Sequence, residues 1–385
     1  MRIGIDIRNV GKKRTGDEAV FFNLTKNLAK IDGRNEYWLF TDISEEKTVE
    51  KIKNDLGIRN KANFEVIPLV AGWPLRNKFG WNIWTLPRYL RKNPVDIYHT
   101  QYITPFFVTK RIKIITTIHD ISFNFFPQFI RVIDLIFLKL LIPVSLRRAD
   151  KIIAVSRFTR DEIIKYYNVI PEKIECVYNA VADIFAESNF SSIQLGEVRK
   201  KYDLPEKFIF YIGTMQPRKN LSLLVEAFGK AKEKISDLKL VLAGGKNAYN
   251  FDKKIGKLIH KFSLSEDVIF PGFVPEEEKK AFFRLAEAFC SPSLYEGFDI
   301  PILEAFATGI PVIASEIPVH REIAGDSALF FAASNSSELA EKIGNICTDE
   351  GFRNLLISKG KNQSEKFSWK DSAEKTLAIY EKMGI

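Results

Sequence analysis

The 385-residue sequence contains only three cysteines, Cys176, Cys290 and Cys347, and no CxxC pair. Disulfide frameworks and cysteine-rich metal clusters need more cysteines at closer spacing, so neither is expected to hold the fold together. Long apolar runs are also missing, because charged residues interrupt even the most hydrophobic segment, residues 121–148. A charged side chain at the centre of a bilayer costs about 3 kcal/mol, so we expect no membrane-spanning segment.

The chain also lacks the start of a signal peptide, because Asp6 and Arg8 interrupt its first apolar stretch. We therefore expect a cytoplasmic protein, with peripheral contact at the inner membrane face as an open alternative. Lys and Arg number 57 against 48 Asp and Glu, a formal net charge of +9. This excess favours an anionic partner, but no aromatic and basic recognition motif accompanies it, so we expect no nucleic acid.

Strand-like runs alternate with helix-period segments along the chain, which is typical of a parallel sheet covered by helices. The first predicted strands lie in the segments RIGIDI, EYWLFT, FEVIPL, VDIYHT, RIKIITTIHD, KIIAVS and KIECVY. After a linker-like stretch at 179–196, the pattern restarts with KFIFYIG, LKLVLAG, DVIF, AFCSPS, PVIAS and ALFF. The chain is long enough for two separate cores.

We therefore predict an α/β protein with two Rossmann-like domains that face each other across a cleft, where ligands bind at the carboxyl ends of the strands. Residues 1–188 are expected to form the first domain and residues 189–367 the second. Residues 368–385 carry apolar side chains at helical spacing. This last segment is predicted to be an amphipathic helix that packs toward the first domain.

The segment YEGFDIPILEAFATGIPVIAS, residues 295–315, has the pattern of a loop, a short helix and a strand. Asp299 is predicted to cap the helix, Pro301 suits its first turn, and Gly309 suits the left-handed position that ends a helix. The backbone N–H groups at such a helix start have no partners within the helix. They favour a phosphate group there.

Two carboxylates flank this predicted anion site, Glu296 in the loop and Glu304 in the helix. A carboxylate can accept hydrogen bonds from adjacent hydroxyl groups, so the pair favours a ligand with a sugar on each side of its phosphates. The expected phosphate contacts come from the backbone of Phe298, Asp299 and Ile300. An isolated pair of glutamates more often lies on the surface, and only the loop and helix around this pair favour a site.

A second segment, YIGTMQPRKNLSLLVEAF, ends a predicted strand at Gly213 and begins a helix near Asn220. Arg218 and Lys219 lie in the connecting loop, at the carboxyl end of that strand. Fixed cationic groups stabilise the negative charge that develops on a leaving diphosphate. The alternative explanation is that Arg218 and Lys219 form an ordinary basic helix cap. The anion site predicted in residues 295–315 makes a second phosphate contact the better explanation.

These two segments resemble the retaining glycosyltransferases of family 4, which have the GT-B fold. Glu296 and Glu304 match the E-x7-E pattern of that family, and a G-x-PV-x-AS strand follows them. The resemblance implies that Glu296 contacts the transferred hexose and Glu304 the ribose of a nucleotide sugar. It also implies that residues 189–367 bind the donor, with Gly213, Arg218 and Lys219 at its diphosphate, and that residues 1–188 bind the acceptor. Asp299 stands where many members have glycine.

In the first half, IITTIHDISF ends a predicted strand with His119 and Asp120. This pair resembles the family's histidine beside the transferred sugar. The resemblance implies that His119 contacts a hexose hydroxyl or steadies the acceptor, with Asp120 to orient it; a histidine satisfied in the core is the alternative. Three histidines are not assigned to catalysis: His99, interpreted as core packing, His260 and His320.

The first strand-to-helix turn contains Gly16, a weaker match to the glycine-rich turn of the family. A single glycine can simply shape a turn, but it also permits close approach of a ligand to the backbone. Asp17 follows it, and a carboxylate repels phosphate. Gly16 is therefore assigned, with Asp120, to the acceptor.

The apolar part of 121–148 ends with Arg147 and Arg148. We interpret it as a buried helix. The alternative is a helix that lies on a membrane, because basic amphipathic helices bind anionic lipid surfaces and related enzymes take lipid-linked acceptors.

We predict a retaining, metal-independent glycosyltransferase that moves a hexose from a nucleoside-diphosphate sugar to a glycan or lipid-linked acceptor. No DxD triplet is present to bind a metal-bridged diphosphate, so no metal or other cofactor is expected. The family mechanism implies that a donor phosphate oxygen takes the acceptor proton. PRKN and HDISF resemble bacterial mannosyltransferases and favour GDP-mannose, while UDP-glucose and UDP-N-acetylglucosamine stay open.

Two rival functions remain open at this point. A nucleotide-sugar epimerase on the same fold would change the donor without any acceptor. A non-catalytic protein that binds anionic ligands would use the net positive charge alone. A dinucleotide dehydrogenase is disfavoured, because no G-x-G-x-x-G follows the first strand.

Overall fold

The computed structural model describes residues 1–12, 16–70, 80–186, 191–245 and 250–384. The chain divides into two compact units. Unit 1 comprises Met1–Ile121, Val132–Asn179 and Ser368–Ile385, and unit 2 comprises Ser122–Arg131 and Ala180–Phe367. The main segment of unit 2 begins at Ala180, whereas the linker composition suggested residue 189. The reason is that helix α7 (Asp183–Ala186) already packs against helices of unit 2, α11 (Glu276–Leu285) and α12 (Ile300–Thr308).

Unit 1 contains a parallel sheet in the order β3-β2-β1-β4-β5-β6-β7. Its strands are β1 (Arg2–Asp6), β2 (Glu36–Thr41), β3 (Phe64–Pro68), β4 (Ile97–Gln101), β5 (Lys113–Ile118), β6 (Lys151–Ala154) and β7 (Ile174–Cys176). Each strand lies in a segment that the sequence predicted as a strand, except that β4 continues one residue further, to Gln101. The order β3-β2-β1-β4-β5-β6 is that of a Rossmann fold, and it reverses between β1 and β4.

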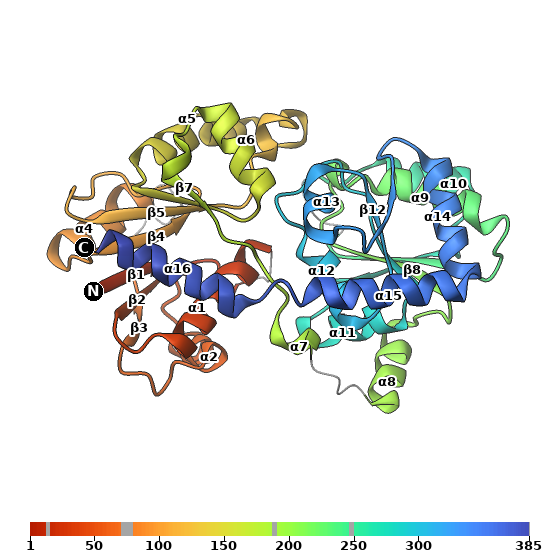
Figure 1. Ribbon diagram of the computed structural model, residues 1–385, viewed down its shortest axis with the longest axis horizontal. Helices are drawn as coiled ribbons and strands as arrows, with labels where there is room; N and C mark the ends of the chain where they lie inside the picture. Colours follow the sequence, from red (N-terminus) through yellow and green to blue (C-terminus); the bar gives the residue numbers. More distant parts are fainter. Residues whose placement is uncertain (13–15, 71–79, 187–190, 246–249, 385) are drawn as a thin grey trace. The chain divides into compact units, whose positions relative to one another are not determined.

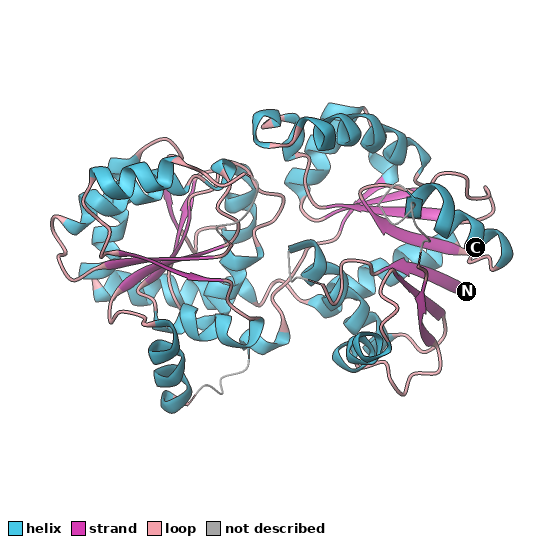
Figure 2. Ribbon diagram, turned by 180° about the vertical axis from the view of Figure 1, so that it is seen from behind, coloured by secondary structure: helices cyan, strands magenta, loops and turns pink. Residues whose placement is uncertain are grey.

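Helices cover both faces of this sheet (Figure 1, Figure 2). They are α1 (Gly16–Ile31), α2 (Glu46–Leu56), η1 (Trp81–Thr85), α4 (Leu86–Lys92), α5 (Val132–Arg148), α6 (Arg157–Tyr167), η4 (Pro171–Lys173) and α16 (Trp369–Met383). The predicted C-terminal helix is confirmed as α16, which packs against α1. The Ser368 hydroxyl caps α16 by accepting a hydrogen bond from the Asp371 N–H at 3.0 Å.

Unit 2 repeats the Rossmann arrangement, with the parallel order β10-β9-β8-β11-β12-β13. Its strands are β8 (Phe208–Ile212), β9 (Lys239–Ala243), β10 (Val268–Gly272), β11 (Ala288–Ser291), β12 (Val312–Ser315) and β13 (Leu329–Phe331). Besides α7, α11 and α12, its helices are η2 (Ser122–Asn124), η3 (Pro127–Phe129), α8 (Ser192–Tyr202), η5 (Pro217–Lys219), α9 (Leu221–Lys232), α10 (Lys254–Lys261), α13 (Pro318–Ala324), α14 (Ser336–Thr348) and α15 (Glu350–Ser364). Here too the strand order reverses, between β8 and β11.

The prediction that the apolar segment before Arg148 is a buried helix is wrong. Helix α5 forms there, but only Ile142, Ser145 and Leu146 of its residues are buried. Its sequence is apolar on all sides, so the pattern could not show which face packs on the sheet. Across the described residues, no helix has both the length and the apolar character that a bilayer crossing requires.

Candidate active site

The two segments singled out in the second half follow neighbouring strands of unit 2. The loop with Arg218 and Lys219 follows β8, and the loop with Glu296 follows β11. These strands pair directly at the point where the strand order reverses, which is where Rossmann folds bind their ligands. The Leu294 N–H donates to the Arg218 carbonyl oxygen at 2.9 Å, so the backbone itself holds the two loops together.

Two cations converge on Glu296, which is only 6% exposed. Lys219 Nζ lies 2.5 Å from its Oε1, and Arg218 Nη1 lies 3.3 Å from its Oε2. Burial raises the pKa of Glu296, but the charges of Lys219 and Arg218 outweigh burial and lower the pKa to about 2. The carboxylate is therefore ionised at neutral pH. Two cations against one carboxylate leave an excess positive charge at the carboxyl end of β8.

Glu304 lies on α12 and is also buried, at 3% exposure. Lys279 of α11 places its Nζ 2.5 Å from each carboxylate oxygen. Burial raises the pKa of Glu304 to about 7, although Lys279 opposes this shift. The contact to Oε2 lacks hydrogen-bond geometry, so this oxygen keeps its capacity to accept. No sequence pattern indicated Lys279, because it lies in an ordinary charged stretch, EEEKK.

The start of α12 differs from the prediction in one respect. Asp299 occupies the cap position with φ 70°, but its side chain makes no capping hydrogen bond. Its carboxylate instead accepts a hydrogen bond from the Ser291 hydroxyl and lies 3.0 Å from Nε2 of His320. The Phe298 ring is buried and packs edge-on against Phe367. Phosphate contacts assigned to this loop therefore depend on its backbone N–H groups.

The other helix signals in this segment are confirmed. Pro301 lies in the first turn of α12, and Gly309 ends the helix at φ 78°. At the end of β8, Gly213 adopts φ 155°, and a Cβ there would lie 2.6 Å from the Tyr211 hydroxyl. The turn therefore requires glycine at this position. By contrast, a Cβ at Gly16 would meet no described atom within 4 Å, so packing does not require a glycine at the start of α1.

In unit 1, His119 follows β5 and is 7% exposed. Its Nε2 lies 3.0 Å from Gln101 Oε1, at the end of β4, and its Nδ1 lies 4.0 Å from Asp17 Oδ1. Gln101 and Asp17 are therefore partners of the ring that the sequence did not indicate, and the orienting role of Asp120 stays a prediction.

His99 is confirmed as a core histidine. Its ring is fully buried between Tyr380, whose hydroxyl lies 2.6 Å from Nδ1, and Thr117, whose hydroxyl lies 2.8 Å from Nε2. Burial lowers the pKa of His99 to about 3. The ring is therefore neutral at physiological pH and joins α16 to the sheet.

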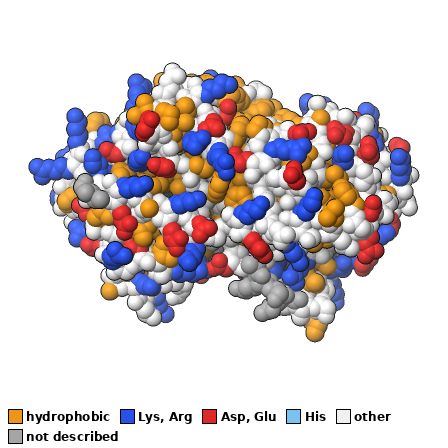
Figure 3. All heavy atoms as spheres, in the orientation of Figure 1, with side chains coloured by type: hydrophobic (Ala, Val, Ile, Leu, Met, Phe, Trp, Pro, Cys, Tyr) orange, Lys and Arg blue, Asp and Glu red, His pale blue; other side chains and the backbone are white. Residues whose placement is uncertain are grey.

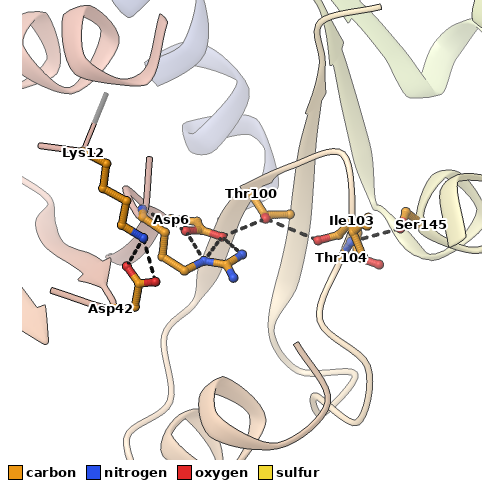
Figure 4. Close-up of polar contacts among 8 residues, drawn as sticks. Asp6, Lys12, Asp42, Thr100, Ile103, Thr104 and Ser145 are labelled. Atoms are coloured by element: carbon orange, nitrogen blue, oxygen red, sulfur yellow. Dashed lines mark hydrogen bonds and ion pairs between the residues drawn. The ribbon is translucent and has the colours of Figure 1, made fainter. Parts of the chain in front are cut away.

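Figure 4 shows a polar cluster at the carboxyl ends of β1 and β4 that the sequence analysis missed. Arg8 donates hydrogen bonds to Asp6 from its backbone N–H and from its guanidinium, the shortest at 2.9 Å to Oδ1 and 2.7 Å to Oδ2, and the Thr100 hydroxyl donates another at 3.3 Å. Burial raises the pKa of Asp6, but Arg8 outweighs burial, and the pKa lies below its ordinary value. Lys12 and Asp42 pair beside it at 2.6 Å. The sequence feature that could have indicated this cluster is Asp6, an aspartate at the end of a predicted strand.

Two family descriptions together match most of the chain. Residues 15–183 match "Glycosyltransferase Family 4", and residues 196–363 match "Glycosyl transferases group 1". The two matches correspond to the Rossmann-like sheets of units 1 and 2.

Curated relatives of the chain include two mannosyltransferases of Escherichia coli. The chain is 28% identical to O-antigen chain mannosyltransferase B over 269 residues, which are 70% of each protein. It is 30% identical to the serotype-specific mannosyltransferase WbdA over 233 residues, 60% of this chain. That match covers only 28% of WbdA, so the chain corresponds to less than a third of this relative's length.

Solved structures with a similar fold include Anabaena Alr3699/HepE in complex with UDP-glucose. The TM-score is 0.75 over 99% of this chain and 100% of that chain, at 16% sequence identity. The fold is therefore shared although few residues are. This similarity adds the shared GT-B fold, and the two family matches, which together cover most of the chain, show that the chain is a glycosyltransferase of the families they describe.

Proposed function

We propose that the protein is a retaining, metal-independent mannosyltransferase that uses GDP-mannose. The observation that carries this proposal is the buried cluster of Lys219, Arg218 and Glu296 beside the start of α12. Both E. coli relatives are named as mannosyltransferases, which favours mannose as the transferred sugar. The acceptor is proposed to be a glycan or a lipid-linked glycan.

In the proposed complex, the donor diphosphate binds Lys219, Arg218 and the backbone N–H groups at the start of α12. It competes with Glu296 for the two cations, which frees this carboxylate to accept hydrogen bonds from the hexose hydroxyls. Glu304 accepts hydrogen bonds from the ribose hydroxyls. On unit 1 the acceptor contacts are assigned to Gly16, Asp120 and His119.

The proposed reaction retains the configuration of the anomeric carbon. The bond from this carbon to the β-phosphate oxygen breaks, and the acceptor oxygen forms its new bond on the same face. The acceptor proton passes to an oxygen of the leaving diphosphate, whose growing charge Lys219 and Arg218 stabilise.

The proposal that no metal takes part is supported by the available side chains. Within the described ranges, no group of three His, Cys, Asp or Glu side chains gathers in a way that could hold a metal ion. The cationic side chains supply the positive charge that a bound metal ion would otherwise supply. A rate of sugar transfer that is unchanged by an excess of EDTA is the expected result, and loss of transfer with recovery on adding Mg²⁺ or Mn²⁺ would contradict it.

A thermal-shift panel with GDP-mannose, GDP, UDP-glucose and UDP-N-acetylglucosamine tests the donor. A ligand at one hundred times its Kd stabilises the folded protein by about 2.7 kcal/mol, which raises the Tm by several degrees. We expect this rise with GDP-mannose and GDP. A rise in Tm with the UDP compounds alone would reject GDP-mannose as the donor. Such a result would agree with the UDP-glucose that is bound to HepE.

Incubation of the donor without any acceptor separates transfer from epimerisation. We expect at most slow release of free mannose, with no isomeric nucleotide sugar. Appearance of a new nucleotide sugar would favour the epimerase. Added mannosyl acceptors should then yield an α-linked product, because α-configured GDP-mannose reacts with retention.

We also propose that α5 contacts an anionic membrane surface. Five of its apolar residues are exposed: Val132, Ile133, Ile136, Leu140 and Val144. Their spacing of three and four residues places them on one side of the helix, away from its buried residues. In Figure 3, hydrophobic side chains gather over the part of unit 1 where Figure 1 places α5, with Lys and Arg beside them.

Replacing Ile136 and Leu140 together with asparagine tests this contact. Inserting each such side chain into lipid contributes about 1.5–3 kcal/mol, so we expect at least a tenfold loss of binding to phosphatidylglycerol vesicles. Ile193 and Leu355 are equally exposed on other helices, so the same replacement there is a matched control. Equal binding by the two double variants, or no preference of the unmodified protein for anionic over phosphatidylcholine vesicles, would reject the proposal.

A further inference from the structure

His320 is fully buried on α13, and its position fixes which ring nitrogen carries hydrogen. Nδ1 lies 2.9 Å from the Ser315 carbonyl oxygen, which can only accept, so Nδ1 donates. Nε2 faces the other way and lies 3.0 Å from Oδ2 of Asp299. This second contact lacks hydrogen-bond geometry and is therefore mainly electrostatic.

The charge of the His320 ring follows from these two contacts. In a neutral ring with hydrogen on Nδ1, the lone pair of Nε2 would face the carboxylate of Asp299 and repel it. With a proton on Nε2 as well, the ring is a cation beside the Asp299 anion. A buried charge needs such a partner of opposite sign. Among the described residues, Ser291 is the one whose hydroxyl donates a hydrogen bond to the Asp299 carboxylate. This hydroxyl is neutral, so it does not balance the negative charge.

Asp299 stands at the cap position of α12, beside the N–H groups to which we assign the diphosphate. Its φ of 70° is a conformation that glycine adopts at lower cost than aspartate. A carboxylate there would repel a diphosphate unless its charge were balanced. Two further charged groups lie in the same region. Burial lowers the pKa of Lys279 but the charge of Glu304 outweighs it, and burial raises the pKa of Glu304; Asp299 adds a smaller contribution to both, so the charge of Asp299 reaches the donor site.

We propose that His320 is a positioning residue that balances the charge of Asp299 from the protein interior, so that the start of α12 accepts a nucleoside diphosphate. This inference rests on the proposed donor site. It assigns a role to a histidine that neither contacts the donor nor lies on its loop. It also explains how an aspartate can occupy the start of an anion-binding helix.

The test compares His320→Phe with the double variant that adds Asp299→Gly. A bare carboxylate near the diphosphate should weaken GDP binding by about 10- to 100-fold in His320→Phe. Guanosine, which has no phosphate, should bind this variant as it binds the unmodified protein. Removing the carboxylate in the double variant should restore GDP affinity to within about threefold. Isothermal titration calorimetry gives each Kd, and circular dichroism confirms that each variant is folded.

Equal losses for GDP and guanosine, or a loss that persists in the double variant, would show that His320 acts only by packing and would overturn the inference. Should His320→Phe not fold, His320→Gln removes the charge with less change in volume and is held to the same outcomes. If the unmodified protein binds UDP instead, UDP and uridine replace the guanine pair. Failure of the unmodified protein to bind either diphosphate would reject the proposed function itself. If only the inference about His320 is wrong, the unmodified protein still binds a diphosphate, so the two cases can be distinguished.

Discussion

Replacing Lys219 with alanine is expected to lower kcat by about 10²- to 10³-fold, the typical loss when one fixed group that stabilises a developing charge is removed. Lys219 Nζ is held 2.5 Å from Glu296, so its position is fixed before any donor binds. The interaction strengthens as the diphosphate leaves, so kcat should fall more than the donor KM rises. Steady-state kinetics with GDP-mannose and a mannosyl acceptor measures both parameters.

Two controls separate catalysis from stability in this experiment. Removing Lys219 leaves Glu296 buried beside Arg218 alone, which by itself can destabilise the fold. The Tm and the circular dichroism spectrum of Lys219→Ala report whether the variant is folded at the assay temperature, and kcat should be low in the folded variant. Lys230 makes a partly exposed ion pair with Glu226 at 3.1 Å on α9, so Lys230→Ala should leave kcat unchanged. A Lys219→Ala enzyme with normal kcat would disprove the diphosphate site.

Donor affinity should rise about tenfold between pH 6 and pH 8, because Glu304 ionises in this range. Its pKa is about 7, so about nine-tenths of the protein carries a protonated Glu304 at pH 6 and an ionised one at pH 8. Only the ionised carboxylate offers all its lone pairs to the ribose hydroxyls. GDP-mannose has no phosphate that titrates near pH 7, so calorimetry with this donor reports on the protein.

Glu304→Gln should bind GDP-mannose weakly and with no such step. A step of equal size in the variant would assign the pH dependence to another group. Stability changes in the opposite direction: the pKa of Glu304 in the folded protein, about 7, exceeds its ordinary value of 4.5. The folded state therefore binds more protons between these two values, and the free energy of unfolding falls as pH rises from 4.5 to 7. Glu304→Gln should remove this decrease in stability.

Local patterns were enough to predict most of the fold. Every strand overlaps a predicted segment, and only β4 and β10 continue past theirs, by one and two residues. Continuous β-branched and apolar runs mark strands buried on both faces of a parallel sheet. The ends of α12 followed from Pro301 and Gly309, whose preferences act within a single turn. The packing of α5 escaped prediction, because a helix that is apolar on all sides does not indicate which side meets the core.

The sequence by itself determined the two Rossmann-like units, the loops that carry Lys219 and Glu296, and the helix that carries Glu304, since these depend on short-range periodicity and turn residues. Only the tertiary structure decided which side chains meet: Lys279 with Glu304, and His320 with Asp299. These partners come from different helices, and their charges depend on burial, which no local pattern encodes. Folding brings them together by packing helices on the sheet of unit 2, and the pKa of Glu304 follows from that packing.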